Sequence, residues 1–309
     1  MSDASGIPEG VELDSSLARL TTVRTGGPAD YLARPGSTDR LVELLAWAKR
    51  EGIPTGIVGS GSNLLVSDQG FRGLAIKLDG EFREIELDGN VVLLGGAVRL
   101  PSAAAKSVEW GLSGLEFGVN IPGTAGGAVR MNANAYGGRL ADVIESVELC
   151  DASGARQVST DELGFGYRSS AIRPDQVVAR VEFRLTPADP EAIREKLAEM
   201  RAWRKETQPS GIKTFGSTFK NPEHEAAEGM SAGQLLDRAG CRGLTIGGAR
   251  FSEVHANFIE NLGEATTADV VAVMSAGRDR VERECGVVLE PEVQVLGEID
   301  WPEGWQVDR

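Results

Sequence analysis

The spacing of apolar residues along the chain predicts five helices, each bounded by recognisable capping residues. In the first of them, residues 38–50, Leu41, Leu44 and Leu45 fall on one face, and the pattern stops before Gly52. Apolar residues three to four positions apart indicate an amphipathic helix, and glycine is the usual residue just beyond its end. The other four helices are expected at 101–110, opened by Pro101; at 190–206, behind Asp189 and Pro190; from Ser231 to about Ala239, with Ser231 and Gln234 as a capping box; and from Thr266 or Thr267 to Gly286.

Short runs rich in Val, Ile and Leu, bounded by Gly, Asp or Asn, predict strands between these helices. Strands and helices do not alternate regularly, so the expected fold class is α+β rather than a β-α-β series. The expected strands are 30–33, 55–58, 74–78, 82–87, 91–95, 143–151, 177–185, 256–260 and 287–296.

The best candidate for a domain boundary follows the charged helix 190–206, where the sequence reads Gln208-Pro209-Ser210-Gly211. We expect a partly frayed extension at 1–20, with the first 10 to 15 residues the most frayed. Three structural parts are then expected, at 21–80, 81–208 and 209–309.

Charge and composition exclude several classes of function. The net charge of −14 opposes nucleic-acid binding, which needs a basic surface. No apolar run approaches the roughly 20 residues that span a bilayer, and the N-terminus lacks the pattern of a signal peptide. Cys150, Cys241 and Cys285 form no C-x-x-C pair, so we expect reduced, mostly buried thiols and no metal site.

The segment GSGSN at 59–63 predicts an anion-binding loop. It resembles a dinucleotide fingerprint, but the third glycine is missing and the residues that follow cannot form a crossover helix. We therefore expect a nest, in which Gly59 and Gly61 take positive φ and consecutive amides face one anion. Ser60, Ser62 and Asn63 would add side-chain donors, whereas the alternative is a glycine-rich turn that binds nothing.

The segment 118–138 is a second candidate site, because thirteen of its 21 residues are Gly, Ala or Asn. Small residues let the backbone approach a flat ligand closely. A packing seam between two sheets would also use small residues, but it would not need polar Asn120, Thr124, Asn132 and Asn134 within it.

Five segments together resemble the UDP-N-acetylenolpyruvoylglucosamine reductase (MurB) family, from about Thr21 to about Gly297: GSGSNLLVSD, GVNIPGTAGGAVRMNANAYGG, FGYRSSAI, GSTFKNP and LEPEVQVLG. The resemblance implies a two-part FAD-binding domain of the PCMH flavoprotein type at 21–80 and 81–208, and a C-terminal α+β substrate-binding domain at 209–309. It implies a cytoplasmic oxidoreductase that binds FAD non-covalently and reduces UDP-N-acetylglucosamine enolpyruvate to UDP-N-acetylmuramate with NADPH, as a monomer or weak dimer without a membrane. The cofactor-binding residues it implies are Gly59, Ser60, Gly61, Ser62, Asn63, Leu64, Asn120, Pro122, Gly123, Thr124, Gly127, Asn132 and Ala135.

The same resemblance assigns chemistry to three residues. The residue matching Ser217 protonates the carbon beside the substrate carboxylate, the one matching Arg168 binds that carboxylate, and the one matching Glu292 lies in the active site. From the residues alone, Ser217 would be a turn serine and Arg168 a surface ion-pair partner. Glu290 competes with Glu292, because both face the same side of an extended segment.

Other assignments stay open in the sequence. Candidates to contact the UDP diphosphate are Lys213, Lys220, Arg204, Lys205 and Arg242, and His255 is expected to be a satisfied structural histidine. Ser217 lies 49 positions after Arg168, and the interval contains no tyrosine, which fits a shorter subclass without a tyrosine-bearing loop over the substrate. The alternative functions are a related FAD oxidase or dehydrogenase of a hydroxy acid, and a nucleotide-sugar-binding protein without redox activity.

Overall fold

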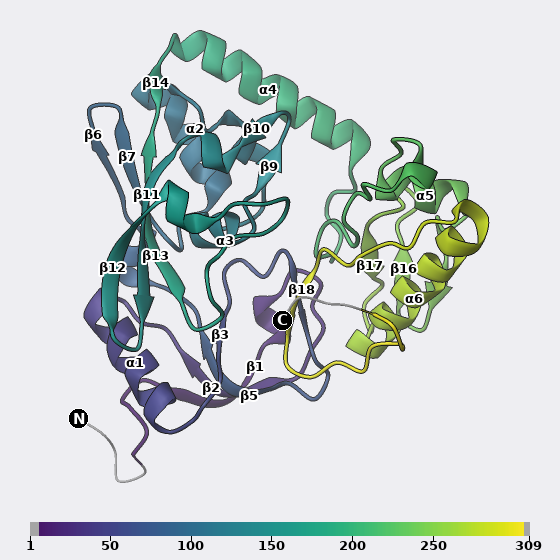
Figure 1. Cartoon of the computed structure of the whole chain (residues 1–309), viewed down its shortest axis with the longest axis horizontal. Helices are drawn as coiled ribbons and strands as arrows, with labels where there is room; N and C mark the ends of the chain where they lie inside the picture. The colour runs from purple at the N-terminus through teal and green to yellow at the C-terminus, as the bar shows by residue number, and fades with distance from the viewer. Residues whose placement is uncertain (1–5, 306–309) are drawn as a thin grey trace. The chain divides into compact units, whose positions relative to one another are not determined.

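The computed structural model describes residues 6–305, which fold into two compact units (Figure 1). The first unit comprises the residues up to Asp14, Asp30–Ser60 and Gly73–Arg204; the second comprises Ser15–Ala29, Gly61–Arg72 and the residues from Lys205. Among the described residues, no helix has both the length and the apolar character needed to cross a membrane.

The first unit is built on a five-stranded antiparallel sheet with the order β12-β11-β13-β7-β6. Alternating apolar residues, such as Val147 on β11 and Val181 on β13, point into a core that also receives Leu100 and Val129 from helices. These elements are β6 (Ile85–Asp88), β7 (Val91–Gly95), β11 (Ile144–Asp151), β12 (Gly154–Ser159), β13 (Val177–Arg184), α2 (Leu100–Trp110) and α3 (Ala125–Arg130).

A four-stranded sheet with the order β1-β2-β5-β3 packs with helix α1 (Thr38–Arg50) around a second core. Leu41, Leu44 and Trp47 of α1 are buried there, and Ser37 caps the helix by accepting a bond from the Arg40 N–H. In Figure 1, α1 lies beside β11 and β12. The strands are β1 (Glu12–Ser16), β2 (Pro28–Ala33), β3 (Thr55–Ile57) and β5 (Phe71–Ile76).

The long helix α4 (Pro190–Thr207) packs Ile193 and Leu197 against Ala104 of α2 and against Val119. Lys196 of α4 forms an ion pair with Glu116, with 3.4 Å between Nζ and Oε1. The Glu116 side chain is 2% exposed and accepts bonds from the Ser113 hydroxyl and the Gly114 N–H. Two small strand pairs complete this unit: β8 (Leu112–Ser113) with β14 (Thr186–Pro187), and β9 (Asn134–Ala135) with β10 (Gly138–Arg139).

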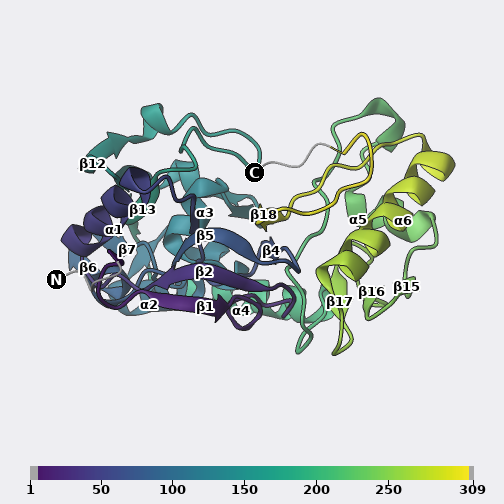
Figure 2. The same ribbon diagram turned by 90° about the horizontal axis from the view of Figure 1, so that it is seen from below.

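The second unit combines two helices, a three-stranded antiparallel sheet and a parallel strand pair. Figure 2 shows α6 beside β16 and β17, and the core between them contains Phe251 and Met274. The elements are β4 (Leu64–Val66), α5 (Ala232–Arg238), β15 (Thr245–Ile246), β16 (Ala249–Phe251), β17 (Ile259–Asn261), α6 (Thr267–Cys285) and β18 (Gln294–Leu296).

All five predicted helices are confirmed, with the capping boxes at Ser231 and Thr266. Helix α3 was missed, because glycines at 126 and 127 lower intrinsic helix propensity and tertiary packing of Ala128 and Val129 overrides it.

Three strand predictions were wrong in extent, and the strand expected at 256–260 begins only at Ile259 and ends at Asn261. Residues 80–83 form a 3-10 helix, so the strand expected at 82–87 begins only at Ile85. In the segment 287–296, alternate residues are buried, yet regular pairing is confined to Gln294–Leu296. The fraying expected through residue 15 is wrong for β1, while residues 1–5 lie outside the described part of the chain.

Candidate functional site

The two glycine-rich segments meet inside the first unit, at Gly59 and Thr124. A Cβ atom added to Gly59 would lie 2.9 Å from the Thr124 Oγ1 atom, so only glycine fits without displacing that side chain. Thr124 in turn caps α3, because its Oγ1 accepts a bond from the Gly127 N–H at 3.3 Å. The Gly123 carbonyl accepts a bond from the Leu100 N–H, which fixes the turn that follows Pro122.

Lys77 orients the start of the predicted anion-binding loop. Its Nζ atom donates to the Gly59 carbonyl at 2.6 Å. Because the two ends of a trans peptide point in opposite directions, this bond turns the Ser60 N–H away from Lys77. Burial and the nearby charges of Arg34 and Arg83 lower the pKa of Lys77, whereas Asp79 raises it, so three cationic side chains lie near this peptide. Such an arrangement suits an anionic ligand.

Gly61 opens the part of the loop that belongs to the second unit. Its φ is +68°, and an added Cβ would lie 2.1 Å from the Leu20 carbonyl oxygen. The Thr22 N–H and hydroxyl both donate to the Gly61 carbonyl at 3.0 Å. Positive φ was expected at both glycines of the loop but occurs only at Gly61; Gly59 is required for close approach instead.

Asn132 and Tyr136 hold uncommon backbone conformations in the segment 118–138, with φ of +40° and +53°. Non-glycine residues in this region are strained and concentrate at functional sites. The Asn132 Nδ2 atom donates to the Gly166 carbonyl at 2.9 Å, whereas its buried Oδ1 atom has no hydrogen-bond partner in the protein. A buried acceptor of this kind is suited to a ligand N–H. Ala135 follows in β9.

Asn120 joins the same segment to helix α4. Its Nδ2 atom donates to the Tyr136 hydroxyl at 2.6 Å and to the Met200 carbonyl at 2.7 Å, and its own carbonyl accepts a bond from Arg204. The Tyr136 ring meets Trp203 edge-on, with centroids 5.2 Å apart. Arg204, a candidate for diphosphate binding, is therefore engaged with the main chain in the first unit.

Arg168 belongs to the first unit and has a φ of +54°. It lies at the tip of a tight turn in which Gly166 and Ser169 exchange main-chain hydrogen bonds at 3.1 and 3.3 Å. The half-buried guanidinium lies over the Tyr167 ring, 5.4 Å from its centroid. The turn thus presents a fixed cation at its apex.

Ser217 and Glu292 lie on neighbouring chain segments of the second unit. Thr218, the residue after Ser217, accepts a bond from the Glu292 N–H at 2.9 Å, and Phe219 bridges to Pro291. Ser217 itself bridges to Phe258. These pairings bring the predicted proton donor and the predicted carboxylate to one part of the fold, and both residues are half-buried.

Asn63 connects the predicted cofactor loop to Glu292. Its Nδ2 atom donates to the Glu292 carbonyl at 3.2 Å, and its carbonyl accepts a bond from the Gln294 N–H at 3.1 Å. The pairing continues with Leu64 opposite Gln294 in the β4–β18 ladder. A Cβ added to Gly216 would lie 3.6 Å from the Ser62 carbonyl, so the loop also adjoins the segment of Ser217.

The structure separates the two candidate carboxylates at 290 and 292. The Glu290 side chain is 71% exposed, and its carboxylate is 3.7 Å from the Lys220 Nζ atom. Glu292 is half-buried beside the loop of Asn63. A carboxylate that is withdrawn from water is the better candidate for proton transfer, so the geometry favours Glu292.

Arg242 and His255 have structural roles in the second unit. Arg242 forms an ion pair with Asp237 at 2.5 Å and donates to the carbonyl of Glu253 at 2.8 Å. The His255 Nδ1 atom accepts a bond from the Asn257 N–H, and burial lowers the pKa of the imidazole. His255 is thus the satisfied histidine that the sequence predicts. Lys213, Lys220 and Lys205 stay candidates for the diphosphate.

The three cysteines are free thiols, and the expected burial holds for Cys150 and Cys241. Burial raises the pKa of Cys150 to about 12 and that of Cys241 to about 11, so neither is a reactive thiolate. Within residues 6–305, no cluster of His, Cys, Asp and Glu side chains is arranged to hold a metal ion.

Sequence reasoning missed Lys77, Arg130 and Tyr136. Lys77 and Arg130 act on main-chain carbonyls of distant segments, and no local pattern reports such contacts. Tyr136 lies between two recognised small-residue runs, so its presence in a stretch otherwise made of Gly, Ala and Asn was an available signal.

Models of known protein families match segments of both units. The FAD binding domain model matches residues 29–159, and the model of the UDP-N-acetylenolpyruvoylglucosamine reductase C-terminal domain matches residues 208–296. The reductase of that name from Anaeromyxobacter dehalogenans is 43% identical over 285 residues, covering 92% of this chain and 85% of the relative. Reductase 2 from Symbiobacterium thermophilum is 44% identical over 287 residues, covering 92% of each. This chain belongs to the UDP-N-acetylenolpyruvoylglucosamine reductase family.

The crystal structure of a family member from Thermus caldophilus superimposes with a TM-score of 0.78 at 37% identity, covering 94% of this chain and 98% of that one. The predicted α+β fold with an FAD-binding domain of the PCMH type is thereby confirmed. The chain is an FAD-dependent oxidoreductase, as the sequence resemblance implies. The domain boundaries at 80/81 and 208/209 and the individual site residues stay predictions.

The residues of the first unit fit FAD. Gly59 leaves room beside Thr124, Lys77 and the neighbouring arginines supply positive charge, and the Asn132 Oδ1 atom lacks a donor. A flavin diphosphate is anionic, and its ring system carries an N–H that matches such an acceptor.

Proposed function

We propose that this chain catalyses the NADPH-dependent reduction of UDP-N-acetylglucosamine enolpyruvate to UDP-N-acetylmuramate, in the cytoplasm, as a step of peptidoglycan precursor synthesis. The observation that carries the proposal is the meeting of three predicted segments in the second unit. The loop of Asn63 binds the Glu292 main chain, and Glu292 binds the main chain beside Ser217. The names of the relatives and the FAD binding domain support the same reaction.

FAD, when bound, accepts a hydride from NADPH and delivers it to the enolpyruvyl double bond. Lys77, which orients the Gly59–Ser60 peptide, and that peptide would hold the diphosphate of the cofactor. Asn132 offers its Oδ1 atom as a fixed acceptor. No residue of these two loops is His or Cys, the side chains through which oxidases of related fold tether a flavin.

Three residues act on the substrate. Arg168 binds the carboxylate and stabilises the negative charge that spreads toward it as hydride adds to the neighbouring double bond. Ser217 then donates its hydroxyl proton to the carbon next to the carboxylate. Glu292, half-buried beside the loop of Asn63, supports this transfer by holding a proton or a water molecule within the site.

A two-step anaerobic titration tests the proposal. The purified protein is mixed first with NADPH and then with UDP-N-acetylglucosamine enolpyruvate, and the flavin spectrum is followed throughout. We expect bleaching with NADPH and recovery of the oxidised spectrum only after the second addition, with UDP-N-acetylmuramate as product. A flavin that bleaches but ignores the enolpyruvyl substrate, or a protein that binds no flavin, would contradict the proposal.

A further inference from the structure

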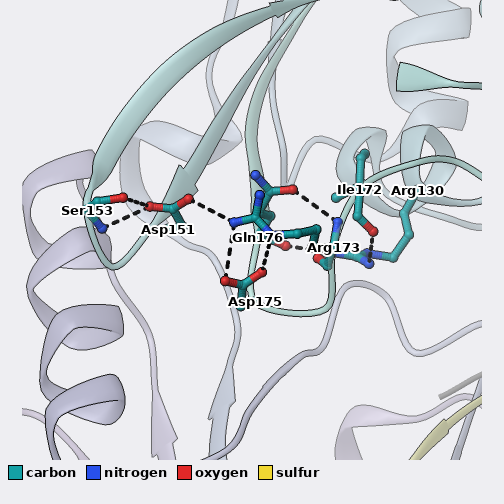
Figure 3. A network of polar contacts seen from close by, with 7 residues as sticks. All are labelled: Arg130, Asp151, Ser153, Ile172, Arg173, Asp175 and Gln176. Atoms are coloured by element: carbon teal, nitrogen blue, oxygen red, sulfur yellow. Dashed lines mark hydrogen bonds and ion pairs between the residues drawn. The ribbon is translucent and has the colours of Figure 1, made fainter. Parts of the chain in front are cut away.

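Arg130, the last residue of α3, spans three main-chain carbonyls of one distant loop. Its Nη1 atom donates to Ile172 at 3.3 Å, and its Nη2 atom donates to Arg173 at 3.2 Å and to Gln176 at 2.6 Å. Figure 3 shows the guanidinium directed into this loop. These three acceptors are uncharged carbonyl oxygens, and burial lowers the pKa of Arg130.

Two further bonds attach the same loop on the other side. The Ser170 hydroxyl donates to the Arg130 carbonyl at 2.8 Å, and the Asn132 Nδ2 atom donates to the Gly166 carbonyl at 2.9 Å. The loop 166–176 is therefore tied to residues 130–132 both before and after Arg168. We call these five hydrogen bonds the Arg130 clamp.

The Arg130 clamp explains how Arg168 keeps its backbone conformation. A non-glycine residue at φ +54° is strained and persists only when its surroundings over-determine it. The main-chain bonds between Gly166 and Ser169 close the turn, but they do not fix the turn on the rest of the unit. The Arg130 clamp does so, because its bonds hold the chain that enters the turn, at Gly166, and the chain that leaves it, from Ser170 to Gln176.

We propose that Arg130 is a positioning residue for Arg168 in the reduction of the enolpyruvyl substrate. This inference rests on the proposed function, because Arg168 is the residue that binds the substrate carboxylate. A guanidinium suits the task, since its planar fork offers five N–H donors that reach several carbonyls at once. A lysine would offer a compact ammonium and could not span all three.

Arg173 supplies a matched control in the same loop. Its exposed guanidinium pairs with Asp175 at 2.9 Å and with Asp151 at 3.3 Å, and Asp151 also accepts a bond from the Ser153 N–H. Figure 3 shows these contacts on the side of the network away from Arg130. Replacing Arg173 removes an arginine from the loop, yet it leaves the carbonyls that Arg130 binds.

The test measures both half-reactions by stopped flow in Arg130→Met, Arg130→Lys, Ser170→Ala and Arg173→Ala. In Arg130→Met we expect flavin reduction by NADPH to stay within about twofold of wild type. Flavin reoxidation by the enolpyruvyl substrate should slow by roughly 10- to 100-fold, the cost of a displaced binding group. Arg130→Lys and Ser170→Ala should fall between these values, and Arg173→Ala should match wild type.

Amide hydrogen exchange over residues 164–172 gives a readout that needs no substrate. We expect faster exchange in this segment in Arg130→Met than in Arg173→Ala, because an opened clamp frees the turn. Unchanged exchange, equal slowing of both half-reactions, or the same loss in Arg173→Ala would overturn the inference. If Arg130→Met does not fold, Arg130→Lys and Ser170→Ala decide by the same measurements. If the wild-type protein ignores the enolpyruvyl substrate, the proposed function fails, whereas the exchange data still decide whether the clamp exists.

Discussion

The two units hold their predicted catalytic residues by different means. In the second unit, main-chain hydrogen bonds hold the segments of Ser217 and Glu292 together. The Glu292 N–H donates to the Thr218 carbonyl, and the Lys220 N–H donates to the Glu290 carbonyl. In the first unit, side chains bind main-chain carbonyls, as the Arg130 clamp does around Arg168. Main-chain pairing tolerates changes of exposed side chains but not a Cβ atom added where two chain segments touch, whereas the Arg130 clamp depends directly on its side chains.

The largest effect on this comparison is expected from a Cβ atom added where two main-chain segments of the second unit touch. In Gly61→Ala, the new Cβ would meet the Leu20 carbonyl at 2.1 Å, at a residue that also needs φ +68°. We expect a loss of more than about 3 kcal/mol in unfolding free energy and a loss of FAD. Chemical denaturation and the flavin absorbance per protein measure the two effects.

Gly52→Ala is the matched control, because Gly52 has the same φ of +68° but nothing within 4 Å of an added Cβ. This variant should lose only about 1 kcal/mol, the cost of the left-handed conformation. Equal losses in the two variants would mean that close packing of Gly61 is not what constrains the loop.

A smaller effect is expected from a side chain of the first unit. Lys77→Met removes the bond to the Gly59 carbonyl and a positive charge near the diphosphate, so the dissociation constant of FAD should rise about tenfold. Lys106→Met, at an exposed site on α2, should leave the dissociation constant of FAD unchanged. Fluorescence titration of the apoprotein with FAD measures both, and equal affinities in wild type and Lys77→Met would remove Lys77 from the cofactor site.

The same lysine predicts a pH dependence. Burial, followed by the charge of Arg34, lowers the pKa of Lys77 from the ordinary 10.5, so the group loses its proton at a lower pH than an exposed lysine. Anion binding favours the protonated form, and FAD affinity should therefore fall as pH rises through the lowered pKa. In Lys77→Met the fall of FAD affinity with rising pH should become shallower. An unchanged dependence on pH would mean that another group causes it.

A third effect, on stability rather than on cofactor binding, concerns Glu116, which joins Ser113 and Gly114 to Lys196 of α4. Burial alone would raise the pKa of Glu116, but bonds from Ser113 and Gly114 and the charge of Lys196 hold it below 4.5. A depressed pKa contributes stability above the ordinary value that is lost as pH falls through the folded-state value.

We expect Glu116→Gln to cost about 2 kcal/mol at neutral pH and to weaken the loss of stability as pH falls from neutral to below the ordinary glutamate pKa of about 4.3. Glu199→Gln, at an exposed site on α4, is the control. Denaturation curves at several pH values across this range give the unfolding free energy of each variant. If this free energy changes with pH in parallel for Glu116→Gln and wild type, the prediction is contradicted.

The sequence predicts the parts of this molecule that local patterns specify. The capping box at Ser231, the threonine cap before α6 and the apolar stripe of α1 identify helices, and the order of glycine-rich segments identifies the family. Helix α3 escaped because its glycines have low propensity and its stability comes from packing.

The site residues also divide into those that a local sequence pattern reveals and those that it does not. Asn63 and Gly61 are recognisable in the loop at 59–63, although Asn63 turns out to bind the Glu292 carbonyl, which lies 229 residues away. Arg130 and Lys77 could not be found, since each acts on a carbonyl that only the fold brings near. Side chains that bind distant backbone leave no local pattern in the sequence.

The most direct test of the account separates the two half-reactions in Ser217→Ala by anaerobic stopped flow. We predict that NADPH reduces the flavin within about twofold of the wild-type rate, because Ser217 transfers no proton in that step. Reoxidation by UDP-N-acetylglucosamine enolpyruvate should slow by at least about 100-fold, the order of loss for a general acid. If the flavin of Ser217→Ala is reoxidised at the wild-type rate, or if both steps slow equally, the assignment of Ser217 as the proton donor is contradicted.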